Sequence, residues 1–441
     1  MTQQNNNTRN IPHYSEQGQY PDSYYAASAN PKPERPALKD TVDTEICIIG
    51  GGFSGLSAGV HLSETGHQVT VLEGAQIGWG ASGRNGGQIV NGLNASLEKI
   101  QKSYGQDTAN FVGGLVTRGN QIIRRFIADY DIQCDLKEKN IFAAFHKNQM
   151  RDLEAKLKLW ESHGMTDHEM LDKAKMKEYI NSDAYLGGMI DHSGGHLQPL
   201  NLALGEAAAI EKNGGTVYEN TLVVEVKPDA DGVTVLTEFG EVRAKKVLVC
   251  GNAYLNKVVP ELTDRVMPVS TQIIATKPLG DLADELIPSD VCVEDVRYIL
   301  DYYRLSADKR MLFGGGTVYG GTDPADIESK IRPNMEKIFP QLKGVQIDYA
   351  WSGNFALSFS RVPQMGQLHE HVLFAHGYSG HGVTGTHLFG SILADAINGK
   401  TDEFDRFKEI PWIPFPGGRA FRVPYSVAGS WWYALRDAVG F

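Results

Sequence analysis

Three glycines and one acidic residue near the amino end have the spacing of a dinucleotide-binding site. Gly50, Gly52 and Gly55 fit the pattern G-x-G-x-x-G, and Glu73 lies 18 residues after the last of them. The first glycine of this pattern permits a tight turn, the second lets a pyrophosphate approach the backbone, and the third lets a helix pack on a strand. An acidic residue at the position of Glu73 accepts hydrogen bonds from an adenosine ribose.

The segments that flank these residues have the patterns that a dinucleotide fold requires. An apolar run with β-branched side chains at 45–49 predicts a buried strand, a helix is expected over 56–65, and a second strand over 68–72. Free N–H groups at the start of a helix favour an anion, so Phe53 and Ser54 are also expected to contact the cofactor. A glycine-rich turn in an unrelated α/β protein is the competing interpretation.

A second glycine-rich segment follows at 78–88, with the sequence GWGASGRNGGQ. Its glycines indicate that the backbone comes close to a partner, and its polar side chains add hydrogen-bond donors. With a dinucleotide nearby, we expect this partner to be the pyrophosphate and then the isoalloxazine ring of FAD; a plain surface loop is the alternative. The residues expected to bind the cofactor here are Ser82, Arg84, Asn85, Gly86, Gly87 and Gln88.

The strand expected at 246–250 runs into a glycine turn that begins at Gly251. Ligands in open α/β sheets bind at the carboxyl ends of strands, so we expect Gly251 to lie at the cofactor. Val224, in the strand region expected over 216–227, is assigned to the same site.

A further glycine turn at 376–382 lies between a strand expected at 372–375 and a long helix expected at 383–398. The N-terminus of that helix is well placed to stabilise the negative charge of a reduced flavin. The cofactor-binding residues expected at this turn are Gly380, Gly382, Val383 and Thr384.

The composition is that of an ordinary globular protein. The 441 residues are 41% hydrophobic and 22% charged, and the formal net charge of −11 argues against a broad affinity for nucleic acid. The four cysteines have no C-x-x-C spacing, so neither a disulfide framework nor a metal site is predicted. The amino end has no apolar signal region and no apolar run reaches about 18 residues, so we expect no transmembrane segment and a cytoplasmic protein.

The order of the predicted elements indicates an α/β protein in which a Rossmann-type FAD-binding domain is interleaved with an α+β substrate domain built on an antiparallel sheet. Helices are expected at 97–104, 109–129 and 150–163, and residues 256–360 are rich in strands. The expected division is an N-terminal extension at 1–40, the FAD-binding domain at 41–95, 191–255 and 361–400, the substrate domain at 96–190 and 256–360, and a C-terminal tail at 401–441.

The two ends of the chain differ from the body in composition. The first ten residues are polar and are expected to be disordered, whereas the less polar segment 23–27 is expected to dock on the body. The tail contains Trp431, Trp432 and Tyr433 on a short helix-like end. We expect it to pack on the body or on a partner.

Taken together, these motifs resemble those of the D-amino-acid oxidase/glycine oxidase/sarcosine oxidase family of FAD enzymes. The likeness runs from about residue 43 to residue 400. It implies that an amine substrate lies over the flavin and gives a hydride to it, that the resulting imine hydrolyses, and that oxygen reoxidises the flavin with release of hydrogen peroxide. The segments that carry the resemblance are IIGGGFSG at 48–55, Glu73, GWGASGRNGG at 78–87, WSG at 351–353 and GYSGHGV at 377–383.

Departures from the family pattern bear on the cofactor and on the substrate. Sarcosine-oxidase-like members attach the flavin through a His before a Gly, where this chain has Ser82, so FAD is expected to be noncovalent. Glycine-oxidase-like members carry a carboxylate-binding Arg after the WAG motif, where this chain has Asn354 and Phe355, and the sarcosine-oxidase-like Lys is replaced by Thr384. Loss of both cations removes the charge partner of an α-carboxylate.

An amine without a carboxylate beside its reacting carbon is therefore the expected substrate. The segments SYYAAS, ASGRNGGQIVN and PFPGGRAFRVP are most similar to a subgroup that acts on gamma-glutamylated polyamines, which implies a substrate such as gamma-glutamylputrescine. Arg304 or Arg361 would supply a cation by another route, which leaves an amino acid open as a substrate.

The catalytic residues expected from the sequence are His381, Tyr303 and Trp351. Tyr302, Tyr303 and Trp351 would line a substrate cavity on the antiparallel sheet, and each has ordinary core packing as its alternative. Hydride transfer needs the neutral amine, so a desolvated pocket would help and His381 would accept a proton. Packing under the flavin ring is the alternative for His381.

Other classes of function remain open at this stage. The first is an FAD dehydrogenase of a secondary or N-methyl amine, or of an amino acid, with an acceptor other than oxygen, because the family position of an oxygen-activating Lys is Leu312 here. The second is a NAD-dependent dehydrogenase, against which the second glycine turn at 377–382 argues. The third is a dinucleotide-binding scaffold without a redox role. The sequence does not indicate an oligomeric state.

Overall fold

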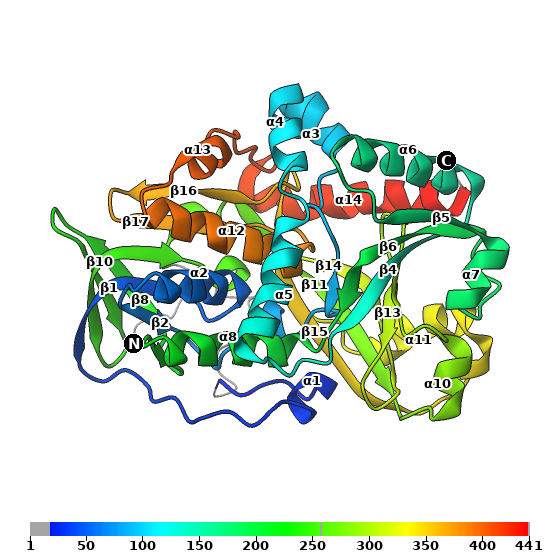
Figure 1. Cartoon of the computed structure of the whole chain (residues 1–441), viewed down its shortest axis with the longest axis horizontal. Coiled ribbons are helices and arrows are strands. Elements are labelled where there is room, and N and C mark those ends of the chain that lie inside the picture. Colours follow the sequence, from blue (N-terminus) through cyan, green and yellow to red (C-terminus); the bar gives the residue numbers. More distant parts are fainter. Residues whose placement is uncertain (1–17, 256–257, 440–441) are drawn as a thin grey trace, which may run out of the picture.

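A computed structural model describes residues 18–255 and 258–439 of the chain, so the expected disorder of the first ten residues lies outside the described part. Two β-sheets lie beside each other, with the first on the left of Figure 1 and the second on the right. This arrangement confirms the predicted pairing of a Rossmann-type unit with an antiparallel sheet.

The first sheet has a parallel centre. The neighbours β17, β10, β1, β2 and β7 pair in parallel, while β16 pairs antiparallel with β17, and β8, β9 and β10 form an antiparallel run. The strands are β1 (Thr41–Ile49), β2 (Val69–Leu72), β7 (Thr216–Tyr218), β8 (Val223–Pro228), β9 (Val233–Thr237), β10 (Glu241–Val249), β16 (Gln364–His369) and β17 (Val372–His376).

Strand β1 is apolar on both faces because both faces are covered. Ile46 and Ile48 pack in a core that includes residues of the neighbouring helices, whereas Cys47 and Ile49 pack on the opposite face, with residues of the β8–β10 run. The helices that pack together on the first face are α2 (Phe53–Glu64), α5 (Arg118–Tyr130), α8 (Pro199–Lys212) and α12 (Gly382–Ile397).

The second sheet is antiparallel throughout, except that β12 and β4 pair in parallel. Its strands are β3 (Gln88–Ile89), β4 (Lys137–Ala144), β5 (His168–Asp172), β6 (Gly187–His196), β11 (Val266–Thr276), β12 (Cys292–Asp295), β13 (Tyr302–Leu305), β14 (Met311–Tyr319) and β15 (Ile347–Ser358). Strand β3 and the 191–196 part of β6 fall in ranges predicted for the FAD-binding domain, yet they pair here. The division into domains otherwise stays a prediction.

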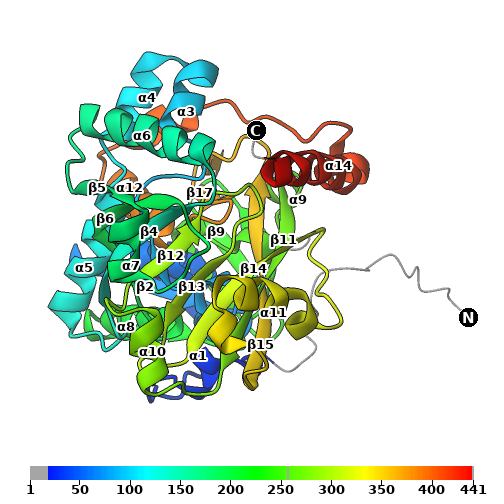
Figure 2. The same cartoon turned by 90° about the vertical axis from the view of Figure 1, so that its right-hand side faces the viewer.

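Helices cover the outer face and one end of the second sheet. A core of residues from α7 (Lys173–Tyr179), α10 (Asp281–Leu286) and α11 (Ile327–Ile338) packs on the outer face. Helix α6 (Lys147–Ser162) packs on β4, β5 and β6, and it lies at the upper end of these strands in Figure 2, beside α3 (Leu97–Tyr104) and α4 (Gln106–Gly113). The helix predicted over 109–129 is two helices, α4 and α5, which are separated by a turn over residues 114–117. Gly114 follows the last residue of α4, and glycine is a poor helix former.

The segment predicted to dock on the body does so. Helix α1 (Tyr24–Ala27) is capped by Ser23, whose side chain accepts a hydrogen bond from the Ala26 N–H. Tyr25 is fully buried, and the side-chain amide of Gln198 at the start of α8 donates to its carbonyl at 3.0 Å. The amino-terminal segment therefore connects to both halves of the molecule.

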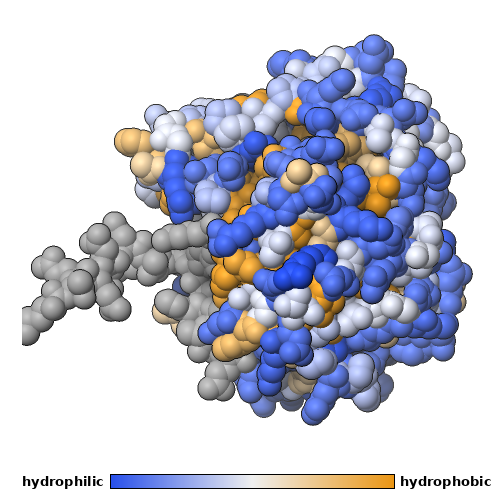
Figure 3. All heavy atoms as spheres, turned by 90° about the vertical axis from the view of Figure 1, so that its left-hand side faces the viewer, coloured by the Kyte–Doolittle hydropathy of each residue, from blue (hydrophilic) through white to orange (hydrophobic). Residues whose placement is uncertain are grey.

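The carboxyl end forms a long helix that projects from the body. The last described element is α14 (Gly418–Val439), which follows α13 (Asp402–Lys408). Two short elements earlier in the chain are α9 (Pro260–Thr263) and η3 (Pro340–Leu342). One side of α14 packs on the body, where Arg422 is buried and donates to Val266 O at 2.7 Å. Trp431 and Trp432 are 73% and 62% exposed, so packing of these two side chains on a partner stays a prediction. Figure 3 shows hydrophobic side chains on the protruding edge that α14 forms. No helix among the described residues is long and apolar enough to cross a membrane.

Candidate cofactor and substrate site

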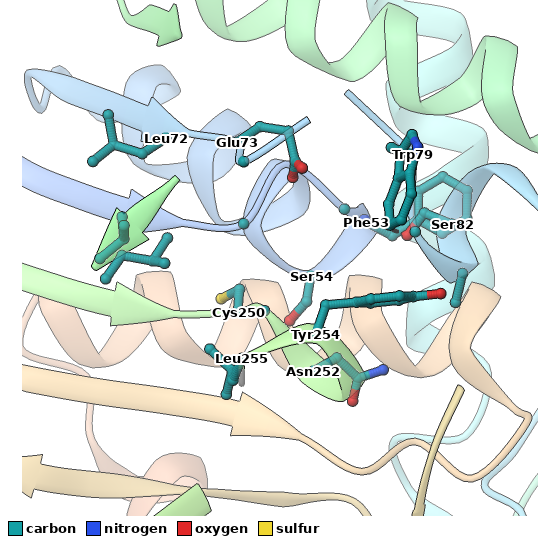
Figure 4. Close-up of a pocket in the computed structure, with 18 of the residues that line it drawn as sticks. Phe53, Ser54, Leu72, Glu73, Trp79, Ser82, Cys250, Asn252, Tyr254 and Leu255 are labelled. Atoms are coloured by element: carbon teal, nitrogen blue, oxygen red, sulfur yellow. Dashed lines mark hydrogen bonds between the residues drawn. The ribbon is translucent and has the colours of Figure 1, made fainter. Parts of the chain in front are cut away.

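A pocket opens where β1, β2 and β10 end and α2 begins (Figure 4). It encloses about 830 Å³ of empty space when its open mouth is included. Its walls come from the ends of parallel strands, where ligands of open α/β sheets bind. The lining segments are 49–54, 72–74, 79–82, 221–223 and 250–255, together with Val258, Tyr378 and Thr386.

The glycine turn after β1 has the geometry that its sequence predicts. Gly50 has a φ of 108°, and a Cβ atom there would lie 2.9 Å from the carbonyl oxygen of Cys250. A Cβ atom at Gly55 would collide with the carbonyl oxygen of Gly50, so Gly55 permits the close packing of helix on strand and does not line the pocket. Gly52 caps α2 without a side-chain hydrogen bond, which leaves the helix N-terminus facing the pocket.

The carboxylate of Glu73 points toward this turn (Figure 4). Its two oxygens accept hydrogen bonds from the N–H groups of Gly51 at 2.7 Å and Ala75 at 2.9 Å. Burial raises the pKa of Glu73 to about 6, the two backbone hydrogen bonds oppose that shift, and the nearby Glu219 adds to it. Glu73 lines the pocket beside the glycine turn, where a ribose hydroxyl would reach it.

Aromatic residues that were not predicted flank the other end of the pocket. The rings of Trp79 and Tyr254 meet edge to face with centroids 5.5 Å apart. Tyr254 and Asn252 belong to the 3₁₀ turn η2 (Asn252–Tyr254), which follows the predicted Gly251. The sequence feature that indicates Asn252 and Tyr254 is the GNAY turn at the end of a strand, of which the sequence analysis assigns only Gly251 to the cofactor site.

The assignment of Val224 is wrong by one residue. Val224 is 52% exposed, whereas Val223 is 4% exposed and lines the pocket. Successive side chains of a strand point to opposite faces, so only one of the two can face the cofactor. Val223 is therefore the residue of β8 whose side chain lines the pocket.

The predicted loop at 78–88 reaches the pocket through its first half. Ser82, in η1 (Ala81–Gly83), lines the pocket, and its hydroxyl accepts a hydrogen bond from the Phe53 N–H at 2.9 Å. Asn85 shapes the loop itself, because its amide donates to Ala81 O and Ser82 O while its oxygen accepts from the Gly87 N–H.

The second half of the loop contacts the second sheet. The guanidinium of Arg84 lies 4.3 Å from the Trp79 ring and donates to Trp79 O, and the amide of Gln88 donates to Val293 O on β12 at 2.9 Å. A Cβ atom at Gly86 would lie 2.7 Å from the ring of Tyr302. The loop therefore joins the two sheets where a flavin ring would lie between them.

Arg304 is buried and its donors are used on the loop and on its neighbours. Its guanidinium donates to Gly86 O and Leu197 O at 2.8 Å, to Leu305 O at 3.0 Å and to the Tyr25 hydroxyl at 3.1 Å. It therefore supports the loop and is not available to a substrate carboxylate. Arg361 donates to the hydroxyl of Tyr298 at 3.0 Å.

Two of the three predicted catalytic residues have structural contacts. Trp351 is buried, and its indole N–H donates to Arg84 O at 3.1 Å, which holds the loop against β15. Tyr303 is 1% exposed, stacks on Phe313 and donates to the hydroxyl of Tyr185 at 3.1 Å in the outer core. The structure thus corrects the placement of Tyr303: Tyr302, on the opposite face of β13, is the residue beside the loop.

The second glycine turn meets the first at the pocket. The hydroxyl groups of Tyr378 and Ser54 lie 2.7 Å apart, and Tyr378 and Thr386 line the pocket. The predicted Gly382 and Val383 begin α12, and Gly380 lies in the turn before it; all three are outside the pocket lining. The hydroxyl of Thr384 donates to Val90 O at 2.7 Å, and Thr384 does not line the pocket.

His381 caps α12 and is half-buried. Its Nδ1 lies 3.3 Å from the side-chain amide nitrogen of Asn94. Burial lowers the pKa of His381 to about 4, and the positive charge of Lys156 adds to the shift. The imidazole is therefore neutral at physiological pH and a weaker base than an ordinary histidine.

The residues that line the pocket fit an adenine dinucleotide. The pocket combines a helix N-terminus whose cap residue, Gly52, has no side chain, a carboxylate beside it and a turn where a Cβ atom would meet the backbone. A family model described as "DAO: FAD dependent oxidoreductase" matches residues 45–396. The chain belongs to this family. This member of the DAO family is an FAD-dependent oxidoreductase.

Relatives and solved structures agree with the family and the fold. The chain is 49% identical to gamma-glutamylputrescine oxidoreductase of Escherichia coli (strain K12), covering 95% of this chain and 98% of that protein. It is 37% identical to the probable oxidoreductase OrdL of Haemophilus influenzae, covering 94% and 97%. Glycine oxidase from Geobacillus kaustophilus superposes with a TM-score of 0.69 at 21% identity, covering 81% of this chain and 95% of that structure. The last similarity shows the fold of this DAO-family member.

Proposed function

We propose that this enzyme oxidises a primary amine whose reacting carbon carries no carboxylate, and that the substrate is a gamma-glutamylated polyamine such as gamma-glutamylputrescine. The relative that is 49% identical over nearly the whole chain has this substrate in its name. The observation that carries the proposal is the use of Arg304 on carbonyl oxygens, together with Thr384 at the position of a carboxylate-binding Lys. A carboxylate next to the reacting carbon would lack the charge partners that the family supplies there.

In the proposed reaction, bound FAD supplies the acceptor for the hydride of the amine carbon. The start of α2 would hold the pyrophosphate and Glu73 would hold the ribose, while Ser82 ties the loop to α2. Desolvation lowers the pKa of an ammonium substrate, which then loses its proton more easily than in water. His381 is neutral at physiological pH, so it is able to accept that proton only as a weak base. Loss of a hydride and a proton converts the amine to an imine, and water hydrolyses the imine to an aldehyde and ammonia.

We further propose that oxygen takes up the two electrons and two protons, with release of hydrogen peroxide, and that the cytoplasm is the compartment. The second candidate is a dehydrogenase that passes the electrons to another acceptor. Leu312, at the family position of an oxygen-activating Lys, is 3% exposed in an apolar core. That observation favours the second candidate, so the acceptor needs its own measurement.

Anaerobic addition of gamma-glutamylputrescine to the FAD-loaded enzyme is expected to bleach the visible absorbance of the flavin. Glycine and sarcosine, which have a carboxylate beside the reacting carbon, are expected to bleach it roughly 100-fold more slowly, equivalent to about 2.7 kcal/mol of activation free energy. Bleaching by these amino acids and not by gamma-glutamylputrescine would show that the proposal is wrong. Hydrogen peroxide formed at one equivalent per aldehyde in air identifies an oxidase, and its absence identifies a dehydrogenase.

A further inference from the structure

The second sheet presents one row of side chains to the first sheet, beginning at the loop that carries Gly86. Gly314 pairs with Tyr302, Tyr302 with Glu294, Glu294 with Phe142, and Phe142 with Met189, on the successive strands β14, β13, β12, β4 and β6. Residues directly opposite each other in a sheet share a face. Val293 and Tyr303 point to the other face, into the outer core. Glu294 is thus an acidic residue on the inner face, next to Tyr302.

Glu294 is buried without a partner. It is 9% exposed, and within the described part of the chain its carboxylate has neither a hydrogen bond nor an ion pair. Burial raises the pKa of Glu294 to about 7, the charge of Lys156 opposes the shift, and Asp295 adds to it. Buried carboxylates are normally paired or hydrogen-bonded, so this one is a candidate for binding a ligand.

Lys156 on α6 is the corresponding cation. Its Nζ lies 3.7 Å from the centre of the Phe142 ring and 4.4 Å from that of Trp160. Over residues 18–255 and 258–439, it forms no ion pair with a carboxylate. Burial lowers the pKa of Lys156 to about 8, and the charges of Glu294 and Asp191 oppose the shift. The two charges therefore influence each other without joining in an ion pair.

The other acidic groups near this pair already have partners. Asp191 accepts hydrogen bonds from Asn91 and Ser193 and lies 3.4 Å from the imidazole of His168. Asp295 is paired with the guanidinium of Arg297 at 2.6 Å. Within the described residues, Glu294 and Lys156 consequently stand out as a carboxylate and an ammonium without an ion-pair partner, each next to Phe142.

The pair also lies on the side of the sheet where the flavin is expected. Tyr302, the neighbour of Glu294, packs against Gly86 in the cofactor loop. The charge of Lys156 contributes to the lowered pKa of His381 at the start of α12. Glu294 is thus connected to the cofactor loop through Tyr302, and Lys156 is close enough to the start of α12 for its charge to affect His381.

We propose that Lys156 and Glu294 bind the amino-acid head group of the substrate, Lys156 its α-carboxylate and Glu294 its α-ammonium. This inference rests on the proposed function, because a gamma-glutamylated polyamine carries such a head group at the end remote from the reacting carbon. It explains how a substrate without a carboxylate at the reacting carbon is still selected by charge. Two opposite, unpaired charges match a zwitterion, whereas a single ammonium would be repelled by Lys156 as it approached Glu294.

The inference separates two amines that share the reacting end. gamma-Glutamylputrescine has the zwitterion and N-acetylputrescine lacks it. In the FAD-loaded enzyme, Lys156→Met and Glu294→Gln are each expected to raise the KM for gamma-glutamylputrescine roughly 10- to 100-fold, because each removes one charge-assisted contact. Both variants are expected to leave kcat/KM for N-acetylputrescine within about threefold of the parent enzyme.

Binding without turnover gives a second readout. gamma-Glutamylethylamide carries the head group but lacks the terminal primary amine that the enzyme is proposed to oxidise, and calorimetry measures its Kd. Lys156→Met and Glu294→Gln are expected to weaken its binding roughly 10-fold or more. Lys158→Met and Glu154→Gln, at exposed positions of the same helix α6, are matched controls that should leave the Kd unchanged.

Three outcomes would overturn the inference. The first is an equal loss of kcat/KM for both amines, which would place the two residues at the reacting amine. The second is a slower reoxidation of reduced flavin by oxygen with unchanged amine binding. The third is an unchanged Kd for gamma-glutamylethylamide. If gamma-glutamylputrescine does not bleach the flavin, the proposed function is wrong, and the calorimetry still decides whether Lys156 and Glu294 bind an amino-acid head group.

Discussion

Burial changes the ionisation of individual side chains along the path from the adenosine end of the site to the substrate. It raises the pKa of Glu73 to about 6 and that of Glu294 to about 7, and it lowers the pKa of Lys156 to about 8. In each case the dominant cause is desolvation, which disfavours the charged form. These groups are therefore poised to gain a partner when cofactor or substrate binds, since an opposite charge or a donor restores the charged form.

The pH dependence of FAD binding tests whether Glu73 gains a hydrogen-bond donor from the cofactor. The raised pKa of Glu73 means that its contribution to the stability of the apoprotein is fully present below pH 4.5, its ordinary value, and is lost as the pH rises through about 6. FAD binding has the opposite dependence, because a ribose hydroxyl donates to the ionised carboxylate. The affinity for FAD is expected to rise roughly 10-fold between pH 5 and pH 7.5. Quenching of FAD fluorescence by the apoprotein measures it.

Glu73→Gln is expected to remove most of this pH dependence and to weaken FAD binding about 10-fold at pH 7.5. Glu225→Gln, at an exposed position of β8, serves as the control and should retain it. A slope that survives in Glu73→Gln would assign the pH dependence to other groups, and the ribose contact would have to be abandoned.

Among the structural elements, those with a local signal were the ones that the sequence predicted. The turn at Gly50, the strand that precedes it and the turn at 376–382 depend on neighbouring residues, and all three are present. The faces of the strands were less predictable. Val223 and Val224 are both apolar, so the sequence does not say which faces the cofactor, and the pairing of β8 with β9 decides it.

The same ambiguity affects β13, where two tyrosines follow each other. Tyr302 faces the cofactor loop and its hydroxyl lies 3.3 Å from that of Thr271, whereas Tyr303 donates to Tyr185 in the outer core. Lys156 and Glu294 had no signal at all, because they come together through the packing of α6 on β4 and the pairing of β12 with β4. Long-range pairing is not visible in one sequence.

Two substitutions, each of which removes one tyrosine hydroxyl, distinguish the roles of the two faces of β13. Tyr303→Phe is expected to lower the free energy of unfolding by about 1 kcal/mol, because the Tyr185 hydroxyl loses its partner, and to leave flavin reduction unchanged. Tyr302→Phe is expected to slow flavin reduction by gamma-glutamylputrescine roughly 10-fold with a smaller effect on stability. Urea unfolding and anaerobic stopped-flow absorbance measure the two effects. The reverse assignment of effects would place Tyr303 and not Tyr302 at the substrate.

At the scale of the whole molecule, the two sheets share one core. Ile46 and Ile48 of β1 belong to the same apolar cluster as Phe142, Met189 and Trp351 of the second sheet. Tyr25 adds to the connection, because its ring packs on Trp351 with centroids 5.1 Å apart and its hydroxyl accepts from Arg304. The cofactor pocket and the sheet row are therefore supported by the same packed residues.

This shared core predicts that the molecule unfolds as one unit. Pulsed hydrogen exchange at increasing urea, read by mass spectrometry, should label peptides of β1 and β14 with the same midpoint. FAD binds at the first sheet, yet an excess of about 100 times its Kd should raise both midpoints together, by an amount equivalent to about 2.7 kcal/mol, because a ligand of the folded state stabilises the whole cooperative unit. If FAD protects β1 alone while β14 becomes labelled at its former midpoint, the sheets unfold separately. The contacts of Tyr25 and Trp351 would then not couple the substrate side to the cofactor.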